Sequence, residues 1–261
     1  MTFAADAFAG RVVVITGGGT GIGRELALAF ARSGADLVLA SRKLENLERA
    51  CGEIRALGRR ALAVQTNIRE QPECVRMAEA AAREFGRIDV LVNNAGANFA
   101  CPAMSITPNG WRTIIDVVLN GTFFASQACA KHMMERKSGR IVSIAATNGM
   151  TASPIIAPSG AAKAAVINLT ATLAVEWAPL GITVNAVSPG AVDTPGASER
   201  VFSEAAKKAI AKRTPLGRMA GPLDCVGAVL FLASDAAAFI TGANLVVDGG
   251  AMFPSVPQLI G

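Results

Sequence analysis

Seven short β-rich runs alternate along this 261-residue chain with segments that have the apolar spacing of helices. Strands that alternate with helices form a parallel sheet, wound with right-handed crossovers and covered by helices on both faces. No linker or repeat divides the chain, so we expect one α/β domain over residues 1–261 with a doubly wound, seven-stranded sheet. The predicted strands are residues 11–16, 36–41, 61–66, 88–94, 140–145, 182–187 and 244–249.

Composition argues against several classes of protein. Charged and turn-forming residues interrupt every apolar run before the roughly 18 residues that a bilayer requires. Residues 1–10 lack the basic and apolar regions of a secretory signal. The five cysteines are scattered without a C-x-x-C pair, which predicts no metal site and a reducing, cytoplasmic location. Few aromatic residues and no long basic stripe argue against a nucleic-acid partner.

A glycine-rich turn, TGGGTGIG (16–23), follows the first predicted strand and opens an amphipathic helix. In a strand–turn–helix unit such glycines let the backbone approach a pyrophosphate, which the helix N-terminus then faces. The pattern therefore predicts a Rossmann-type dinucleotide site. Its expected residues are Gly17, Thr20, Gly21, Ile22 and Gly23.

Three further features accompany the glycine turn: residues 93–96 (NNAG), Lys163 within an alanine-rich helix and residues 188–190 (SPG). With these features the chain resembles a short-chain dehydrogenase/reductase over almost its whole length. The resemblance implies a nicotinamide cofactor beyond the carboxyl ends of the strands. It also implies a homodimer or homotetramer, paired through helices at about 110–135 and 157–178, with a hetero-oligomer left open. The further cofactor contacts that we expect are Asn67, Asn94, Ala95, Gly96, Lys163, Pro189, Gly190, Val192 and Thr194.

The end of the second predicted strand bears on which nicotinamide cofactor is bound. NAD-selective relatives have an acid there for the ribose hydroxyls, whereas this chain has Ser41 followed by Arg42. Because an arginine fork suits phosphate geometry, we expect Arg42, together with Arg24, to hold the 2′-phosphate of NADPH. Asp36 has nearly the spacing of a ribose acid but opens its strand, at the opposite edge of the sheet.

The chain contains no tyrosine, although enzymes of the resembled family normally reduce carbonyls with a Tyr-x-x-x-Lys pair. Ser159 stands four residues before Lys163, where that tyrosine would be, and the usual serine and asparagine positions hold Ala146 and Val118. Lys163 has small or apolar neighbours, so its ammonium needs polar partners. The resemblance implies that the nicotinamide ribose hydroxyls supply them. The candidate catalytic residues that remain are Lys163, Ser159, Asn148, Thr147 and Asn120.

Several segments are similar to the 2,4-dienoyl-CoA reductase branch of the family, which has Ser-x-x-x-Lys. They are residues 38–43, 93–102, 107–124 and 158–165. One subgroup of that branch has an acidic tyrosine fifteen residues before the lysine, and here that position is Asn148.

The reaction of this branch tolerates the loss of a strong acid. Hydride addition to a conjugated thioester gives a dienolate, which is far less basic than an alkoxide and can take its proton from water. We therefore predict NADPH-dependent reduction of a 2,4-dienoyl-CoA or 2-enoyl-CoA. Asn148, Thr147 and Ser159 are the expected hydrogen-bond donors to the oxyanion, with Asn148 contributing more than Ser159.

Residues 196–218 correspond to the mobile lid of the family and carry six Lys or Arg against two Glu. A basic lid would steer a phosphate-bearing acyl-CoA to the site, while a solvated helix face explains the same charges. Two other functions stay open: a carbonyl reductase or alcohol dehydrogenase with a degenerate Ser-Lys site, and a nicotinamide-binding pseudoenzyme subunit. The basic residues of this segment are Arg200, Lys207, Lys208, Lys212, Arg213 and Arg218.

Overall fold

A seven-stranded parallel sheet forms the centre of the molecule, in the strand order β3-β2-β1-β4-β5-β6-β7. The computed structural model describes residues 3–194 and 202–253, and Arg200 with part of the expected lid lies outside them. Every strand pair is parallel, so the predicted doubly wound α/β sheet is confirmed. The strands are β1 (Val12–Thr16), β2 (Asp36–Ser41), β3 (Ala61–Gln65), β4 (Val90–Asn93), β5 (Gly139–Ile144), β6 (Ile182–Pro189) and β7 (Asn244–Val247).

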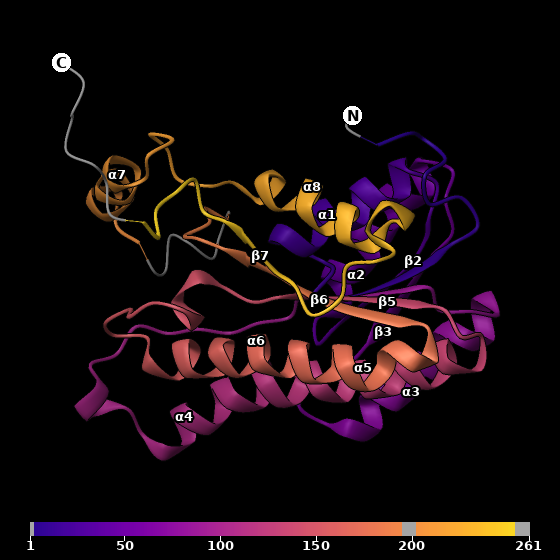
Figure 1. Ribbon diagram of the computed structural model, residues 1–261, viewed down its shortest axis with the longest axis horizontal. Coiled ribbons are helices and arrows are strands. Elements are labelled where there is room, and N and C mark those ends of the chain that lie inside the picture. The colour runs from indigo at the N-terminus through magenta and orange to yellow at the C-terminus, as the bar shows by residue number, and fades with distance from the viewer. Residues whose placement is uncertain (1–2, 195–201, 254–261) are drawn as a thin grey trace.

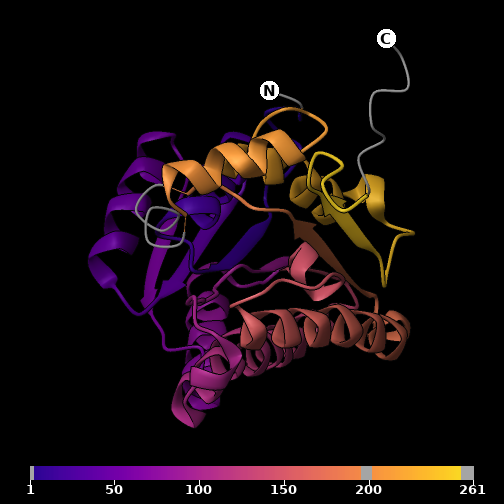
Figure 2. The same ribbon diagram turned by 90° about the vertical axis from the view of Figure 1, so that its left-hand side faces the viewer.

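Helices cover both faces of this sheet (Figures 1 and 2). One face carries α1 (Gly21–Arg32), α2 (Leu44–Ala56) and α8 (Val226–Ala233). The other carries α3 (Gln71–Phe85), α4 (Pro108–Ile115), α5 (Gly121–Glu135) and α6 (Ala157–Trp177). In Figure 1, α7 (Glu204–Arg213) lies at the left-hand end, apart from both layers.

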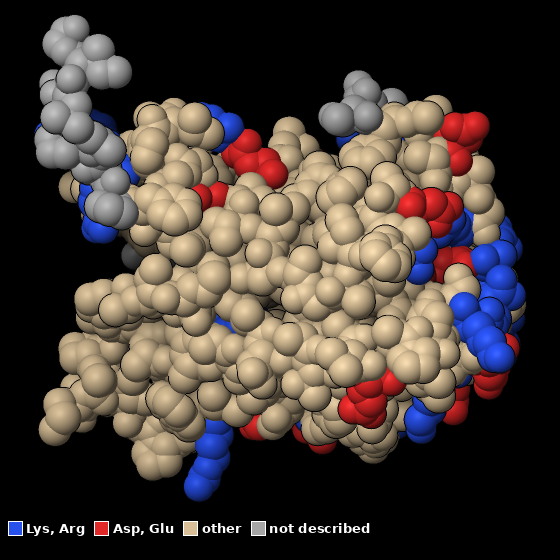
Figure 3. Space-filling view, in the orientation of Figure 1, with Lys and Arg blue, Asp and Glu red and all other residues tan. Residues whose placement is uncertain are grey.

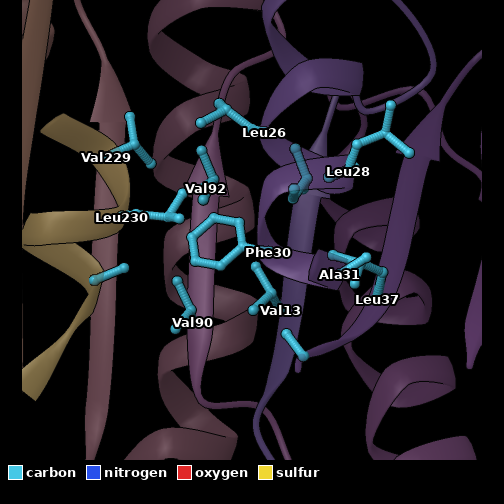
Figure 4. Packing of buried hydrophobic residues seen from close by; sticks show 14 of the residues in the cluster. Val13, Leu26, Leu28, Phe30, Ala31, Leu37, Val90, Val92, Val229 and Leu230 are labelled. Carbon is cyan, nitrogen blue, oxygen red and sulfur yellow. The ribbon is translucent and has the colours of Figure 1, made fainter. Parts of the chain in front are cut away.

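Aliphatic side chains of the strands and helices fill the layer between the sheet and α1, α2 and α8. Phe30 of α1 is fully buried and lies at the centre of this layer, between Val90 and Val92 of β4 and Leu230 of α8 (Figure 4). Side chains of a parallel sheet are buried on both faces, which explains why the strands read as continuous apolar runs.

The amino-terminal edge of the sheet is held by ion pairs. Asp36 is buried and accepts hydrogen bonds from Arg59 Nη2 (2.9 Å) and Arg60 Nε (2.8 Å), and Asp89 pairs with Arg87. Asp36 thus lies at the edge opposite the glycine turn, as its place at the start of β2 predicts.

Charged side chains gather toward the right-hand end in Figure 3, whereas the left part is mostly uncharged and is hollowed.

Among the described residues, one helical stretch, Pro108–Glu135, is long and apolar enough to cross a membrane by length and composition alone. It consists of α4, a π-helical turn over Asp116–Asn120 and α5. Half of its most apolar window is buried, because α5 packs its apolar side chains, among them Cys129 and Met133, into the core beneath the sheet. Packing within the protein therefore accounts for the apolar character of the buried half of this window.

Candidate active site

A cavity of about 410 Å³ opens at the carboxyl ends of β1, β2 and β4, around the glycine turn. We call it the glycine-turn cavity. The structure brings together here eleven of the predicted cofactor residues: Gly17, Thr20, Gly21, Ile22, Ser41, Arg42, Asn67, Asn94, Ala95, Gly96 and Thr194. Residues of the lining that the sequence did not single out are Ala40, Lys43, Asn46, Thr66, Ile68 and Val117.

The glycine turn is held against the end of β4. The Asn94 side-chain amide donates to the carbonyl oxygens of Thr16 (3.0 Å) and Gly17 (3.2 Å), and the Thr16 hydroxyl accepts from the Asn94 N–H at 3.1 Å. A Cβ on Gly23 would lie 2.3 Å from the Gly17 carbonyl oxygen, so only glycine lets α1 start this close to the turn. The helix N-terminus is thereby fixed at the cavity.

The start of α1 suits an anion. Thr20 is the N-cap but its side chain makes no cap hydrogen bond, and the first turn carries no acidic residue. The first N–H groups of a helix have no partner within the helix and carry its positive dipole end. A pyrophosphate fits this donor set.

Arg24 does not line the glycine-turn cavity, although the sequence predicted that it would contact the cofactor phosphate there. Its guanidinium pairs with Glu53 of α2, where Nε donates to Oε1 at 3.2 Å, and with Glu25 at 2.6 Å. The Glu53 hydrogen bond raises the pKa of Arg24 further. Arg24 is not among the residues that line the glycine-turn cavity, whose cations are Arg42 and Lys43.

A second cavity, of about 660 Å³, adjoins the first at Thr194, and we call it the Ser159 cavity. Predicted site residues that line it are Thr147, Asn148, Ser159, Pro189, Gly190, Val192 and Thr194. Most of the other wall residues were not predictable from any sequence motif, because they come from loops and from α7. These are Asn98, Ala100, Ala146, Thr151, Ala152, Ser153, Pro154, Ile155, Ile156, Ala191, Phe202, Ala206 and Arg213.

Asn148 and Ser159 are joined in this cavity. The Asn148 side-chain Nδ2 donates to Ser159 Oγ at 3.3 Å, and the Asn148 Oδ1 is buried without a partner among the described residues. A Cβ on Gly149 would lie 2.7 Å from the Lys163 carbonyl carbon, so glycine allows the turn at Thr147–Gly149 to pack closely on α6. That packing brings the Asn148 amide to Ser159.

Lys163 lies one helical turn beyond Ser159 and is partly buried. Its ammonium donates to the carbonyl oxygen of Ile144 at the end of β5. An ammonium has three donors, so two are left for other partners. Desolvation lowers the pKa of Lys163 from 10.5 to about 8, the direction expected for a cation in an apolar helix environment.

Asn120 takes no part in either cavity within the described structure. It lies at the end of the π-helical turn and its amide donates to Asp116 Oδ1 at 2.9 Å, while Asp116 pairs with Arg69. Val118, at the position usual for asparagine, is buried in the core. Asn120 as a catalytic residue therefore stays a prediction from the sequence.

Known proteins share this architecture. The model of the family described as enoyl-(acyl carrier protein) reductase matches residues 17–252. A probable 2,4-dienoyl-CoA reductase of Bacillus subtilis is 41% identical over 92% of this chain and 96% of its own length. The peroxisomal 2,4-dienoyl-CoA reductase of Danio rerio is 37% identical over 99% of this chain and 88% of its own. A solved short chain dehydrogenase from Bacillus anthracis has a TM-score of 0.86 and 40% identity, covering 95% of this chain and 99% of its own.

The parallel sheet, the glycine turn and the two adjoining cavities define an oxidoreductase of the Rossmann type. More particularly, the chain belongs to the short-chain dehydrogenase/reductase family. Its relatives include 2,4-dienoyl-CoA reductases, which confirms the resemblance inferred from the sequence. Enzymes of this family use nicotinamide cofactors.

Proposed function

We propose that this protein reduces a conjugated acyl-CoA, a 2,4-dienoyl-CoA or a 2-enoyl-CoA, with NADPH as the reductant. The observation that carries the proposal is the hydrogen bond from Asn148 to Ser159, in a cavity of a protein that has no tyrosine. The names of the two 2,4-dienoyl-CoA reductases agree with this substrate class.

The direction of that hydrogen bond supports Ser159 as the group that faces the substrate. Ser159 Oγ accepts from Asn148, so the serine keeps its own O–H proton for another acceptor. A thioester oxygen in the Ser159 cavity is such an acceptor, and its negative charge grows during conjugate reduction. Donors preorganised toward developing charge lower the barrier. Asn148 then acts by polarising and orienting Ser159.

The bound nicotinamide would supply the hydride. The residues of the glycine-turn cavity fit its adenosine and pyrophosphate. Lys163 lines neither cavity, but it lies one helical turn from Ser159, and two of its three donors are left for ribose hydroxyls. Thr194 lines both cavities, and so the cofactor would extend past it toward Ser159. The buried Asn148 Oδ1, which has no partner among the described residues, leaves one further acceptor in the wall of the Ser159 cavity.

Arg42 supports the choice of NADPH. It lines the glycine-turn cavity beside Ser41 and Lys43, and this lining contains no carboxylate among the described residues. A 2′-phosphate would be attracted there by two cations, whereas the ribose of NADH would lack the carboxylate that NAD-selective sites provide.

No hydrogen bond joins Ser159 to Lys163 among the described residues; the lysine donates to Ile144 and the serine accepts from Asn148. A serine hydroxyl without such a partner is a weak acid for protonating an alkoxide. This argues against the carbonyl reductase, while the intact glycine turn and Lys163 argue against the pseudoenzyme.

The purified protein tests the proposal when NADPH oxidation is followed with a 2,4-dienoyl-CoA, a 2-enoyl-CoA and a 3-oxoacyl-CoA in parallel. We expect turnover of a conjugated substrate and little of the 3-oxoacyl-CoA. Fast ketone reduction that ignores the diene would identify a carbonyl reductase. Binding of NADPH without turnover of any substrate would identify a pseudoenzyme.

Oligomeric state and location belong to the same proposal. Trp111 of α4, Met134 of α5 and Val175 of α6 are exposed on the helices through which we expect subunits to pair. We infer a homodimer or homotetramer with a cytoplasmic location. Light scattering of the purified protein measures the oligomeric state.

A further inference from the structure

Arg213 is the last residue of α7 and lines the Ser159 cavity. It is the one charged side chain among the described residues of that lining; the remainder are apolar, small or neutral polar. It also lines a neighbouring cavity of about 260 Å³, which shares Thr147, Thr151 and Gly190 with the first. Arg213 therefore lies where these two spaces meet.

The other basic residues near Arg213 are engaged or lie elsewhere. Lys207 pairs with Asp193 (3.2 Å) and Glu204 (3.3 Å). Arg218 pairs with both carboxylate oxygens of Asp224, and this contact lowers the pKa of Asp224 to about 2. Part of the positive charge of the expected lid is therefore neutralised by neighbouring carboxylates.

Lys208 and Lys212 carry no such pairing among the described residues; both are exposed, as Arg213 is, but unlike Arg213 they line neither cavity. Arg213 has no ion pair with any described residue. One acid, Asp248, lines the smaller cavity together with Arg213. The two oxygens of Asp248 already accept N–H groups of Gly250 (2.8 Å) and Met252 (2.7 Å).

We propose that Arg213 is a specificity-determining residue that binds an anionic group of the substrate while the acyl part lies near Ser159. The inference rests on the proposed function for the identity of the reacting acyl part. Guanidinium groups bind oxyanions through two parallel N–H donors. Such an anion has two sources in this substrate class: a phosphate of the coenzyme A moiety or a carboxylate at the far end of the acyl chain.

Three thioesters separate the two sources: a 2,4-dienoyl-CoA, the same dienoyl group on N-acetylcysteamine, and that N-acetylcysteamine thioester with a terminal carboxylate. Steady-state kinetics compare Arg213→Gln with Lys212→Gln, a charge-matched control one residue away on the same helix. If Arg213 binds a phosphate, Arg213→Gln raises KM for the CoA ester about tenfold and leaves both N-acetylcysteamine esters unchanged. If it binds a carboxylate, only the carboxylated ester is affected.

Equal KM values for Arg213→Gln and Lys212→Gln with all three substrates overturn the inference. Calorimetric titration of NADP⁺-loaded protein with coenzyme A and with the carboxylated thioester provides a readout without turnover. Binding that depends on Arg213, in a protein that reduces none of the thioesters, would keep the anion site and refute the proposed reaction. If the protein reduces the dienoyl-CoA, and Arg213→Gln binds coenzyme A and the carboxylated thioester as tightly as the unchanged protein does, the proposed reaction stands and the anion site is refuted.

Discussion

The side-chain amide of Asn148 donates a hydrogen bond of 3.3 Å to the hydroxyl oxygen of Ser159. Asn148 lies on the turn after β5, and Ser159 lies in the first turns of α6. The pair occupies the region where a Tyr-x-x-x-Lys enzyme of this family has its acid. One of the two amide N–H groups of Asn148 is engaged by Ser159, whose hydroxyl keeps its own proton. We therefore propose the Ser159 hydroxyl as the main donor to the substrate, whereas the sequence led us to expect Asn148.

Replacement of Ser159 should therefore cost more than replacement of Asn148. We expect Ser159→Ala to lower kcat with a 2,4-dienoyl-CoA by about 10²–10³, the range for loss of one oxyanion donor. Asn148→Ala should lower it about tenfold, because it removes only a neutral hydrogen bond that orients the serine. Initial rates at saturating NADPH measure both.

The double variant separates this arrangement from two independent donors. If Asn148 acts through Ser159, adding Asn148→Ala to Ser159→Ala should reduce kcat little further, since residues that share one interaction are not additive. Losses that multiply, or a larger loss from Asn148→Ala alone, would make the Asn148 amide a direct donor to the substrate.

Cofactor selectivity should depend on Arg42 and not on Arg24. Arg42 lines the glycine-turn cavity, whereas Arg24 pairs with Glu25 and Glu53. Arg42→Ala should remove about 1–3 kcal/mol of the preference for NADPH over NADH, the value of a charge-assisted phosphate contact. Dissociation constants of both cofactors, measured by fluorescence titration, give the preference directly.

Arg24→Ala is the matched control for that experiment. It removes an equal charge from the same end of the molecule, and we expect the ratio of the two dissociation constants to stay near that of the unchanged protein. If Arg24→Ala lowers the selectivity for NADPH over NADH as much as Arg42→Ala does, Arg24 would also contact the 2′-phosphate. Equal affinities for NADPH and NADH in the unchanged protein would refute the assignment altogether.

The strands are predictable from the sequence because a parallel sheet buries both faces and leaves uninterrupted apolar runs. Each predicted strand end lies within two residues of the observed one. The glycine-turn cavity is predictable for a related reason: its residues follow strand ends directly, and the carboxyl ends of parallel strands meet at one edge.

Pairings between distant side chains are not predictable in this way. Arg24 meets Glu53 only because α1 packs beside α2, and nothing in the local pattern of either helix indicates that contact. Arg213 is one of six basic residues in its segment, and only the position of α7 against the Ser159 cavity distinguishes it. The direction of the Asn148–Ser159 hydrogen bond likewise depends on how closely the turn packs on α6.

The ammonium of Lys163 makes a testable contribution to stability. Desolvation lowers its pKa from 10.5 to about 8, so below pH 8 the cofactor-free folded protein holds a charge that burial disfavours. Between pH 8 and 10.5 the unfolded chain binds more protons than the folded one, and stability therefore rises with pH over that window. Lys163→Met lacks this ammonium and should not gain stability in the same window.

Urea unfolding of the cofactor-free protein at pH 7 and pH 10 measures this difference. We expect Lys163→Met to be more stable than the unchanged protein at pH 7, with most of its advantage gone at pH 10. The exposed Lys208→Met is the control, and its difference from the unchanged protein should not vary with pH in this manner. A Lys163→Met variant that is less stable at pH 7 would mean that the hydrogen bond to Ile144 outweighs the desolvation of the ammonium.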